Sequence, residues 1–412
     1  MARYFLALFP AFKYKDYQLY ILAQLITVSG TWMQQVAQAW LVLQLTHSAF
    51  LVGVIAAARN LPTLLLFGLF GGAVVDRFKK KKTILFLTKI CAMILALALS
   101  LLTFADVITL TQIATLAFLL GVVDAIDNPA RQVFVARMVE KEDLSSAIAI
   151  NAGVFNTARF IGPSIAGFLI FLIEPAGVFM VNAMGYLAVI LALIFIKEKE
   201  VASAVNGNPL KSIKEGVSYS FSHPTIRSLL IFGAVSSIFG WSFSTILPVV
   251  ARDAFRLGAI ELGYMYSAFG IGSVVATVFV SIFANRVNKI THIISGSLLF
   301  SLSMIIFSYS SEFNFSLFLL FLAGFGLISQ FAMMNATIQY IVPDNIRGRV
   351  MSIHVFTLIG MLPLGSLEAG FMAEHFGSLF AIGFGAYIVF FYGIFIAIKK
   401  KSICFLSFSK SM

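Results

Sequence analysis

The sequence predicts an all-α membrane protein with twelve transmembrane helices. Of its 412 residues, 60% are hydrophobic and 11% charged, and the mean hydropathy of +0.96 lies outside the range of soluble proteins. Apolar runs of about 20 residues, the length that crosses a bilayer as a helix, recur along the whole chain. The twelve predicted spans are 17–45, 50–75, 82–104, 109–136, 145–173, 176–196, 226–250, 260–284, 290–309, 313–341, 350–372 and 377–398.

The connections between these spans alternate in charge. The formal net charge is +11, and lysines and arginines gather in every second connection, for example at 77–82, 197–227 and 399–410. The opposite connections carry only Arg252 and Arg256. This asymmetry predicts orientation in a membrane and not binding to nucleic acid, and it places both termini in the cytoplasm.

The longest polar segment between predicted spans, residues 197–225, separates the first six spans from the last six. The halves also resemble each other weakly, with 128–139 in the first matched by 335–342 in the second. Two repeats around a central site are typical of secondary transporters. The predicted domains are a first six-helix bundle at 1–196, a cytoplasmic linker at 197–225, a second six-helix bundle at 226–398 and a cytoplasmic tail at 399–412.

The turn after the second predicted span is densely charged. Asp76 and Arg77 precede Lys79–Lys82, a cluster that must face water, and Gly72 at the end of the span allows close helix approach. Gly-x-x-x-Asp-Arg followed by basic residues resembles the cytoplasmic signature of the major facilitator superfamily, with Lys79 in place of its second glycine. The plainer interpretation is a positive anchor that only orients the chain.

Four segments together resemble one bacterial subgroup of that superfamily, the enterobactin exporters and related drug-efflux proteins. They are Gly30–Gln35, the turn at Asp76, Asn128–Gln132 and Arg159–Pro163. The resemblance implies the major facilitator fold of two six-helix pseudo-repeats. It also implies a multi-pass protein of the bacterial inner membrane that moves siderophores or amphiphilic drugs outward with the proton gradient.

The predicted fifth span carries a face of small residues. A face of this kind permits close packing against a partner helix, and Pro163 bends the span. The spacing resembles the helix 5 signature of exporters in the superfamily, and plain packing is the alternative. The residues are Ala149, Ala158, Gly162, Pro163, Ala166 and Gly167.

One stripe of the first predicted span is polar. Amides are costly in lipid, so this stripe must face protein or water. We expect Gln34 or Gln38 to line a central cavity, and hydrogen bonding between helices is the alternative. The stripe consists of Gln24, Thr27, Thr31, Gln34, Gln35 and Gln38.

Two arginines lie deep in predicted spans. Arg59 is about 15 Å along its helix at 1.5 Å per residue, and Arg159 lies at a comparable depth. Such charges need a wet cavity or an ion partner. We expect them to make the cavity cationic, so that it attracts an anionic or metal-chelating solute. Structural ion pairs with Asp124 or Asp127 are the alternative.

Asp127 and Arg131 are spaced to share one helix face. With Gly72, Asp76 and Arg77 they are expected to form a cytoplasmic gate, unless they only fix the topology.

Asp124 lies deeper in the same span and Glu368 lies in the eleventh span. Desolvation makes such carboxylates candidates for proton coupling.

No motif supports an enzyme, a metal site or a cofactor. The sequence has no Gly-x-x-x-x-Gly-Lys-Ser/Thr loop for ATP and no His-Glu-x-x-His motif for zinc. The five histidines are scattered singly: His47, His223, His292, His354 and His375.

The prediction is therefore a secondary active transporter without a cofactor, a monomer in the lipid bilayer. It exports a small anionic or amphiphilic solute by alternating access, driven by protons, or by sodium in their place. The alternatives are multidrug efflux, solute import, and a receptor or assembly protein that transports nothing.

Overall fold

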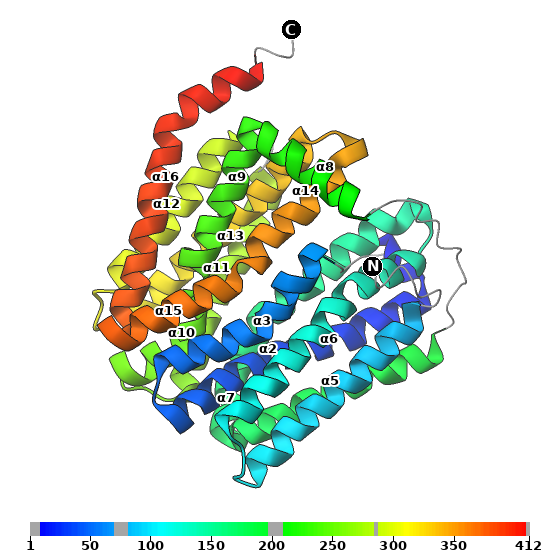
Figure 1. The fold of residues 1–412 in the computed structure, drawn as a ribbon, viewed down its shortest axis with the longest axis vertical. Helices are drawn as coiled ribbons and strands as arrows, with labels where there is room; N and C mark the ends of the chain where they lie inside the picture. The colour runs from blue at the N-terminus through cyan, green and yellow to red at the C-terminus, as the bar shows by residue number, and fades with distance from the viewer. Residues whose placement is uncertain (1–8, 70–80, 197–208, 284–286, 409–412) are drawn as a thin grey trace. The chain divides into compact units, whose positions relative to one another are not determined.

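The computed structural model describes residues 9–69, 81–196, 209–283 and 287–408, and every regular element in these ranges is a helix (Figure 1). The all-α prediction is therefore confirmed. The α-helices are α2 (Lys15–Thr46), α3 (Ala49–Leu69), α5 (Lys81–Phe104), α6 (Leu110–Arg137), α7 (Leu144–Phe195), α8 (Pro209–Ser222), α9 (Pro224–Val235), α10 (Phe243–Val249), α11 (Ala259–Phe283), α12 (Lys289–Phe307), α13 (Phe313–Ile341), α14 (Asp344–Val355), α15 (Leu362–Phe376) and α16 (Ser378–Phe408). The 3₁₀-helices are η1 (Pro10–Lys13) and η2 (Lys141–Asp143), and the π-helices are η3 (Ser236–Trp241), η4 (Val250–Ala254) and η5 (Phe356–Gly360).

Nine helical stretches within the described ranges are long and apolar enough to cross a membrane. The longest of them, Lys141–Phe195, has 55 residues and breaks at Glu174, whose φ of 56° and ψ of 171° cannot belong to a helix. Pro175 follows, so the chain leaves one helix and enters the next between the fifth and sixth predicted spans. A shorter apolar helix covers Ala49–Leu65. The number twelve stays a prediction.

Two of the spanning stretches contain π-helical turns. Pro224–Ala254 consists of α9, η3, α10 and η4, and Asp344–Phe376 consists of α14, η5 and α15. Pro248 and Pro363 lie in these stretches, where a proline removes one backbone donor and clashes with the preceding turn. Such local changes of pitch redirect a helix without exposing unpaired backbone to lipid.

The chain forms two compact units. The first contains residues up to Leu45 and from Leu61 to Asn206, and the second contains Thr46–Asn60 and the residues from Gly207 onward. The boundary thus falls inside α3. In the first unit α5 packs against both α6 and α7, and in the second α13 packs against α11 and α12.

Glycines allow close contact between two helices of the second unit. A Cβ on Gly272 of α11 would collide with the carbonyl oxygen of Phe321 on α13. A Cβ on Gly324 of α13 would collide in turn with the carbonyl oxygen of Phe269 on α11. Small residues at this crossing let the two backbones touch, which is how helices gain packing energy in lipid.

The predicted linker at 197–225 contains a helix that the sequence analysis did not foresee, α8. It packs against α14, where Glu215 forms an ion pair with Arg349. Gly216 lies beside the Cβ of Arg349, and a Cβ on Gly216 would come to 3.0 Å from that atom. Helix α8 therefore packs on α14, which carries Arg347 and Arg349, within the second unit.

Candidate functional site

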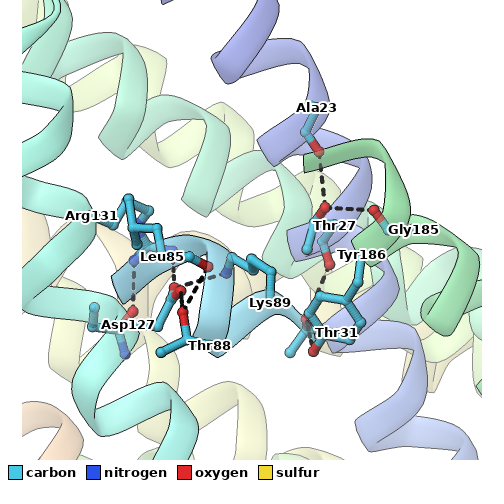
Figure 2. A network of polar contacts seen from close by, with 11 residues as sticks. Ala23, Thr27, Thr31, Leu85, Thr88, Lys89, Asp127, Arg131, Gly185 and Tyr186 are labelled. Carbon is cyan, nitrogen blue, oxygen red and sulfur yellow. Dashed lines mark hydrogen bonds and ion pairs between the residues drawn. The ribbon is translucent and has the colours of Figure 1, made fainter. Parts of the chain in front are cut away.

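An ion pair is buried between α5 and α6 of the first unit. Lys89 Nζ lies 2.8 Å from Asp127 Oδ2, and the two side chains are only 7% and 4% exposed. Thr88 Oγ1 donates to the other carboxylate oxygen, Oδ1, at 2.8 Å. Figure 2 shows Thr88 and Lys89 of α5 both directed at Asp127. Asp127 is thus held by a cation and a hydroxyl on the neighbouring helix.

Arg131 adds a second cation to this cluster. Its Nη1 lies 3.9 Å from Asp127 Oδ2, one helical turn away, which confirms that the two residues share a face. Nη2 donates to Asn128 Oδ1 at 2.6 Å, and the guanidinium lies 4.1 Å from the ring centre of Phe155 on α7. Among the described residues Nε has no hydrogen-bond partner. In the part of the chain that the structure describes, the cluster therefore brings two cations to one carboxylate.

The cluster lies deep within its helices. Lys89 is about 12 Å along α5 from Lys81, and Asp127 about 15 Å along α6 from Arg137, at 1.5 Å per residue. The hydrocarbon core of a bilayer is about 30 Å thick, so this pair falls near its middle. Charges at that depth are expensive and usually serve function.

Tyrosines from two other helices border the cluster. Tyr20 of α2 is fully buried and packs edge to face on Phe134, with 5.3 Å between ring centres. Its hydroxyl has no hydrogen-bond partner in the described part of the chain, and the charges of Asp127 and Arg131 act on it. The Tyr186 ring of α7 lies 6.0 Å from Lys89 Nζ. Helices α2, α5, α6 and α7 therefore each place a polar or charged group at or beside the pair.

Hydrogen bonds continue from Tyr186 to α2 (Figure 2). The Tyr186 hydroxyl lies 3.2 Å from Thr31 Oγ1, and Thr27 Oγ1 donates to the Gly185 carbonyl at 2.7 Å. The polar stripe of the first span thus faces α7.

The predicted cavity glutamines lie in the same stripe. Gln34 accepts a 2.5 Å hydrogen bond from the amide of Asn182 on α7, and both side chains are buried. Gln38 is 3% exposed, and its Oε1 has no partner among the residues described. The alternative of hydrogen bonding between helices holds for Gln34. A cavity role for either residue stays a prediction.

The two predicted cavity arginines belong to different units. Arg159 of α7 lies over the ring of Trp32 on α2, 5.2 Å from its centre, within the first unit. Arg59 of α3 is 6% exposed and belongs to the second unit.

The candidates for proton coupling are half-buried. Asp124 lies on α6, one turn before Asp127, and Glu368 lies on α15. Glu368 Oε1 has no hydrogen-bond partner within the described ranges. The remaining gate residues, Gly72, Asp76 and Arg77, lie outside the described residues.

The small-residue face of the fifth span packs against α2. A Cβ on Gly162 would lie 2.7 Å from both the Ser29 carbonyl oxygen and the Trp32 Cβ. Ala158, Pro163, Ala166 and Gly167 are buried as well, whereas Ala149 is exposed. This face therefore has the packing function that its composition predicts.

Sequence reasoning missed Lys89, Thr88 and Asn182 as members of the site. The signal for Lys89 was present, because a lysine within one span and an aspartate within the next can neutralise each other. Thr88 and Asn182 gave no signal, since isolated hydroxyls and amides are common in membrane helices. In the described part of the chain no three side chains of the metal-binding types gather.

Comparisons with known proteins agree with this architecture. The model of the transmembrane secretion effector family matches residues 7–403. The chain is 26% identical to the staphyloferrin A transporter of Staphylococcus aureus, with 84% of this chain and 87% of that protein covered. It is 24% identical to the multidrug efflux pump Tap of Mycolicibacterium fortuitum (87% and 89% covered) and 25% identical to the enterobactin exporter EntS of Shigella boydii (89% and 88%).

Solved transporter structures share the fold. A transporter of the POT family in complex with 5-aminolevulinic acid superimposes with a TM-score of 0.74 at 13% identity, covering 95% of this chain and 97% of that one. A bacterial homologue of the human lysosomal transporter Spinster superimposes with a TM-score of 0.71 at 14% identity, covering 93% of this chain and 95% of that one.

The family match and the apolar helices establish a multi-pass protein of the bacterial inner membrane, and a transporter instead of an enzyme. The chain belongs to the transmembrane secretion effector family of the major facilitator superfamily.

Proposed function

We propose that this transporter exports a small anionic or amphiphilic solute of the siderophore type, driven by the proton gradient. The observation that carries the proposal is the buried cluster of Lys89, Arg131 and Asp127, in which the described residues place two cations beside one carboxylate near mid-membrane depth. The names of two relatives, the multidrug efflux pump Tap and the enterobactin exporter EntS, support the direction. The staphyloferrin A transporter and EntS support the solute class.

The proposed topology has twelve spans and cytoplasmic termini. The described ranges contain nine apolar stretches, and the break of the longest at Glu174 divides it into two spans. The shorter apolar helix Ala49–Leu65 and helix α2, which is long but polar on one face, supply the other two proposed spans. The proposed domains remain the bundles at 1–196 and 226–398.

The site assignments are part of the proposal. Gln34, Gln38, Arg59 and Arg159 line the solute pathway. Asp124 and Glu368 are the candidates for proton coupling. The proposed cytoplasmic gate consists of Gly72, Asp76, Arg77, Asp127 and Arg131. The carrier acts as a monomer in the lipid bilayer, with the solute and protons as its partners.

Multidrug efflux is the second candidate. The similarity to Tap favours it, because the coverage is as complete as for the siderophore transporters. Import of a solute by the same fold remains the third.

Transport by the purified protein in lipid vesicles tests the proposal. We expect accumulation of a catecholate siderophore against its gradient when a pH gradient is imposed, and little movement of ethidium. Ethidium transport without siderophore transport would favour the multidrug pump, and transport of neither would overturn the proposal.

Arginine variants test the cationic pathway. Arg159→Gln and Arg59→Gln are expected to reduce siderophore transport at least tenfold, because each removes an interior cation. Arg252→Gln, which alters an arginine that pairs with Asp253 outside the bundle interior, serves as the matched control. Normal transport by both interior variants would contradict the cationic pathway.

A further inference from the structure

We propose that Asp127 is a proton-binding carboxylate of the transport cycle, and that Lys89 and Thr88 are the positioning residues that couple its protonation to hydration of the α5–α6 contact. This inference rests on the proposed proton-driven transport and names the coupling site, which Asp124 and Glu368 were expected to supply.

Asp127 is a buried carboxylate that lies beside two cations. Lys89 lies 2.8 Å away and Arg131 3.9 Å away, and all three side chains are buried. The groups that face the carboxylate are Lys89 from α5, Arg131 from its own helix α6, and Tyr20 from α2, and Tyr186 of α7 lies beyond Lys89.

Thr88 provides hydrogen bonds for both protonation states. Its Oγ1 lies 2.8 Å from Asp127 Oδ1 and 3.0 Å from the Leu85 carbonyl oxygen (Figure 2). One hydroxyl hydrogen serves only one acceptor at a time. With Asp127 ionised, Thr88 donates to the carboxylate. With a proton on Oδ1, the acid donates to Thr88 Oγ1, and Thr88 donates to Leu85. Neither state leaves the hydroxyl unpaired.

Protonation removes the negative charge that Asp127 presents to Lys89 and Arg131. The reaction adds one proton to the carboxylate and returns it later, so it is reversible and needs no other reactant. While the acid is neutral, Lys89 and Arg131 remain charged and buried near mid-membrane, which is unfavourable unless water reaches them. Protonation of Asp127 therefore favours a conformation in which water reaches the α5–α6 contact, and ionisation favours one in which the contact excludes water. This difference ties proton binding to a conformational change.

The first test needs no solute. Hydrogen–deuterium exchange of the protein in lipid nanodiscs is measured across pH, with correction for intrinsic exchange. We expect faster exchange of residues 85–92 and 124–131 at acidic pH. Asp127→Asn should show the fast pattern at every pH. Lys89→Gln should move the midpoint to higher pH by about one to three units, because the cation that favours the ionised form is gone.

Infrared difference spectroscopy supplies an independent readout. The wild type should gain a carboxylic-acid carbonyl band on acidification that is absent from Asp127→Asn. Thr88→Val should shift the band, because the acid loses its acceptor, whereas Thr88→Ser should leave it in place. Asp253→Asn, in an exposed ion pair, is the matched control. A pH response and an acid band that survive in Asp127→Asn would overturn the inference.

Where Asp127→Asn does not fold, the wild type, Thr88→Val and Lys89→Gln still decide the question. An unshifted midpoint in Lys89→Gln together with an unshifted band in Thr88→Val would contradict the coupling.

The transport assay separates this inference from the proposed function. Asp127→Asn should lose the accumulation of the catecholate siderophore that the pH gradient drives. Accumulation at the wild-type level in this variant would refute the inference and leave the function intact. Transport of no probe by the wild type would refute the function, and the solute-free measurements would then decide on Asp127 alone.

Discussion

At the scale of single residues, the cost of a charged side chain in the bilayer interior depends more on its interaction partner than on its residue type. A buried lysine or aspartate is costly alone and acceptable as a pair, so Lys89 and Asp127 only make sense together. The sequence shows which spans carry charges. It does not show which side chains meet, because the rotation of each helix about its axis depends on packing against all its neighbours.

Glycine positions show the same dependence. Gly272→Ala places a methyl group against the Phe321 carbonyl oxygen, and the overpacking should cost about 1–3 kcal/mol of stability. Gly153→Ala is the matched control, because a Cβ there meets nothing within 4 Å and alanine favours a helix by up to about 1 kcal/mol. Thermal unfolding in detergent should rank Gly153→Ala at or above the wild type and Gly272→Ala below it. Equal melting temperatures for the two variants would show that the α11–α13 crossing can relax freely.

At the scale of elements, the helix boundaries follow from chemical signals at their ends. Glu312 accepts hydrogen bonds from the backbone N–H groups of Phe315 and Asn314, and these lower the pKa of its carboxyl below the ordinary value of 4.5. The capped form is therefore the ionised one, at the first turn of α13.

This cap predicts a pH dependence at the end of α13. A carboxyl whose pKa is lowered by folding contributes its stabilisation above the ordinary pKa, and the contribution disappears as the pH falls through the lowered value. Exchange of the amides at 313–316 should become faster below about pH 4, the region of an ordinary glutamate pKa. In Glu312→Gln this acid-dependent change should be absent. The same acid response in both proteins would exclude the cap as its cause.

Helix α8 is the element that the sequence analysis missed. Its segment was assigned to a linker because it is polar overall, yet Gly216 fits closely against Arg349 of α14. Gly216→Leu should displace α8 and speed amide exchange over 209–222. Glu215→Gln should change little, because its ion pair with Arg349 is half-exposed and such pairs contribute about 0–1 kcal/mol. A larger effect from the charge change than from the bulky side chain would reverse this assignment of causes.

At the scale of the whole molecule, contacts and not chain order define the compact units. Residues 46–60 cluster with the second unit, although they precede most of the first unit in the chain. Glu374 of α15 accepts hydrogen bonds from Ser48 Oγ at 3.0 Å and from the Phe50 backbone N–H at 3.1 Å. A Cβ on Gly53 would lie 3.1 Å from the Gly370 Cα. A side-chain cap and a glycine contact thus attach the start of α3 to α15.

Membrane topology gives a prediction at the same scale. With cytoplasmic termini and twelve spans, alkaline phosphatase fused after Asp106 or Ser310 should be active, because these turns lie outside the cytoplasm. Fusions after Glu140 or Asn288 should be inactive. Activity in the second pair and none in the first would place the termini outside and invert the assignment from basic residues.

The sequence alone determined the all-helical membrane class and the family. These properties depend on the length of apolar runs, on the cost of placing charge in hydrocarbon, and on local motifs, all of which can be read along one dimension. The break between the fifth and sixth spans, for example, follows from the Glu174–Pro175 step.

Only the tertiary structure decided how interior polar groups pair: Lys89 with Asp127, Gln34 with Asn182, and Glu374 with the start of α3. Each pair joins residues far apart in sequence, and many pairings would satisfy the same composition. The choice among them depends on how helix faces fit together, and that fit is a property of the whole packed bundle.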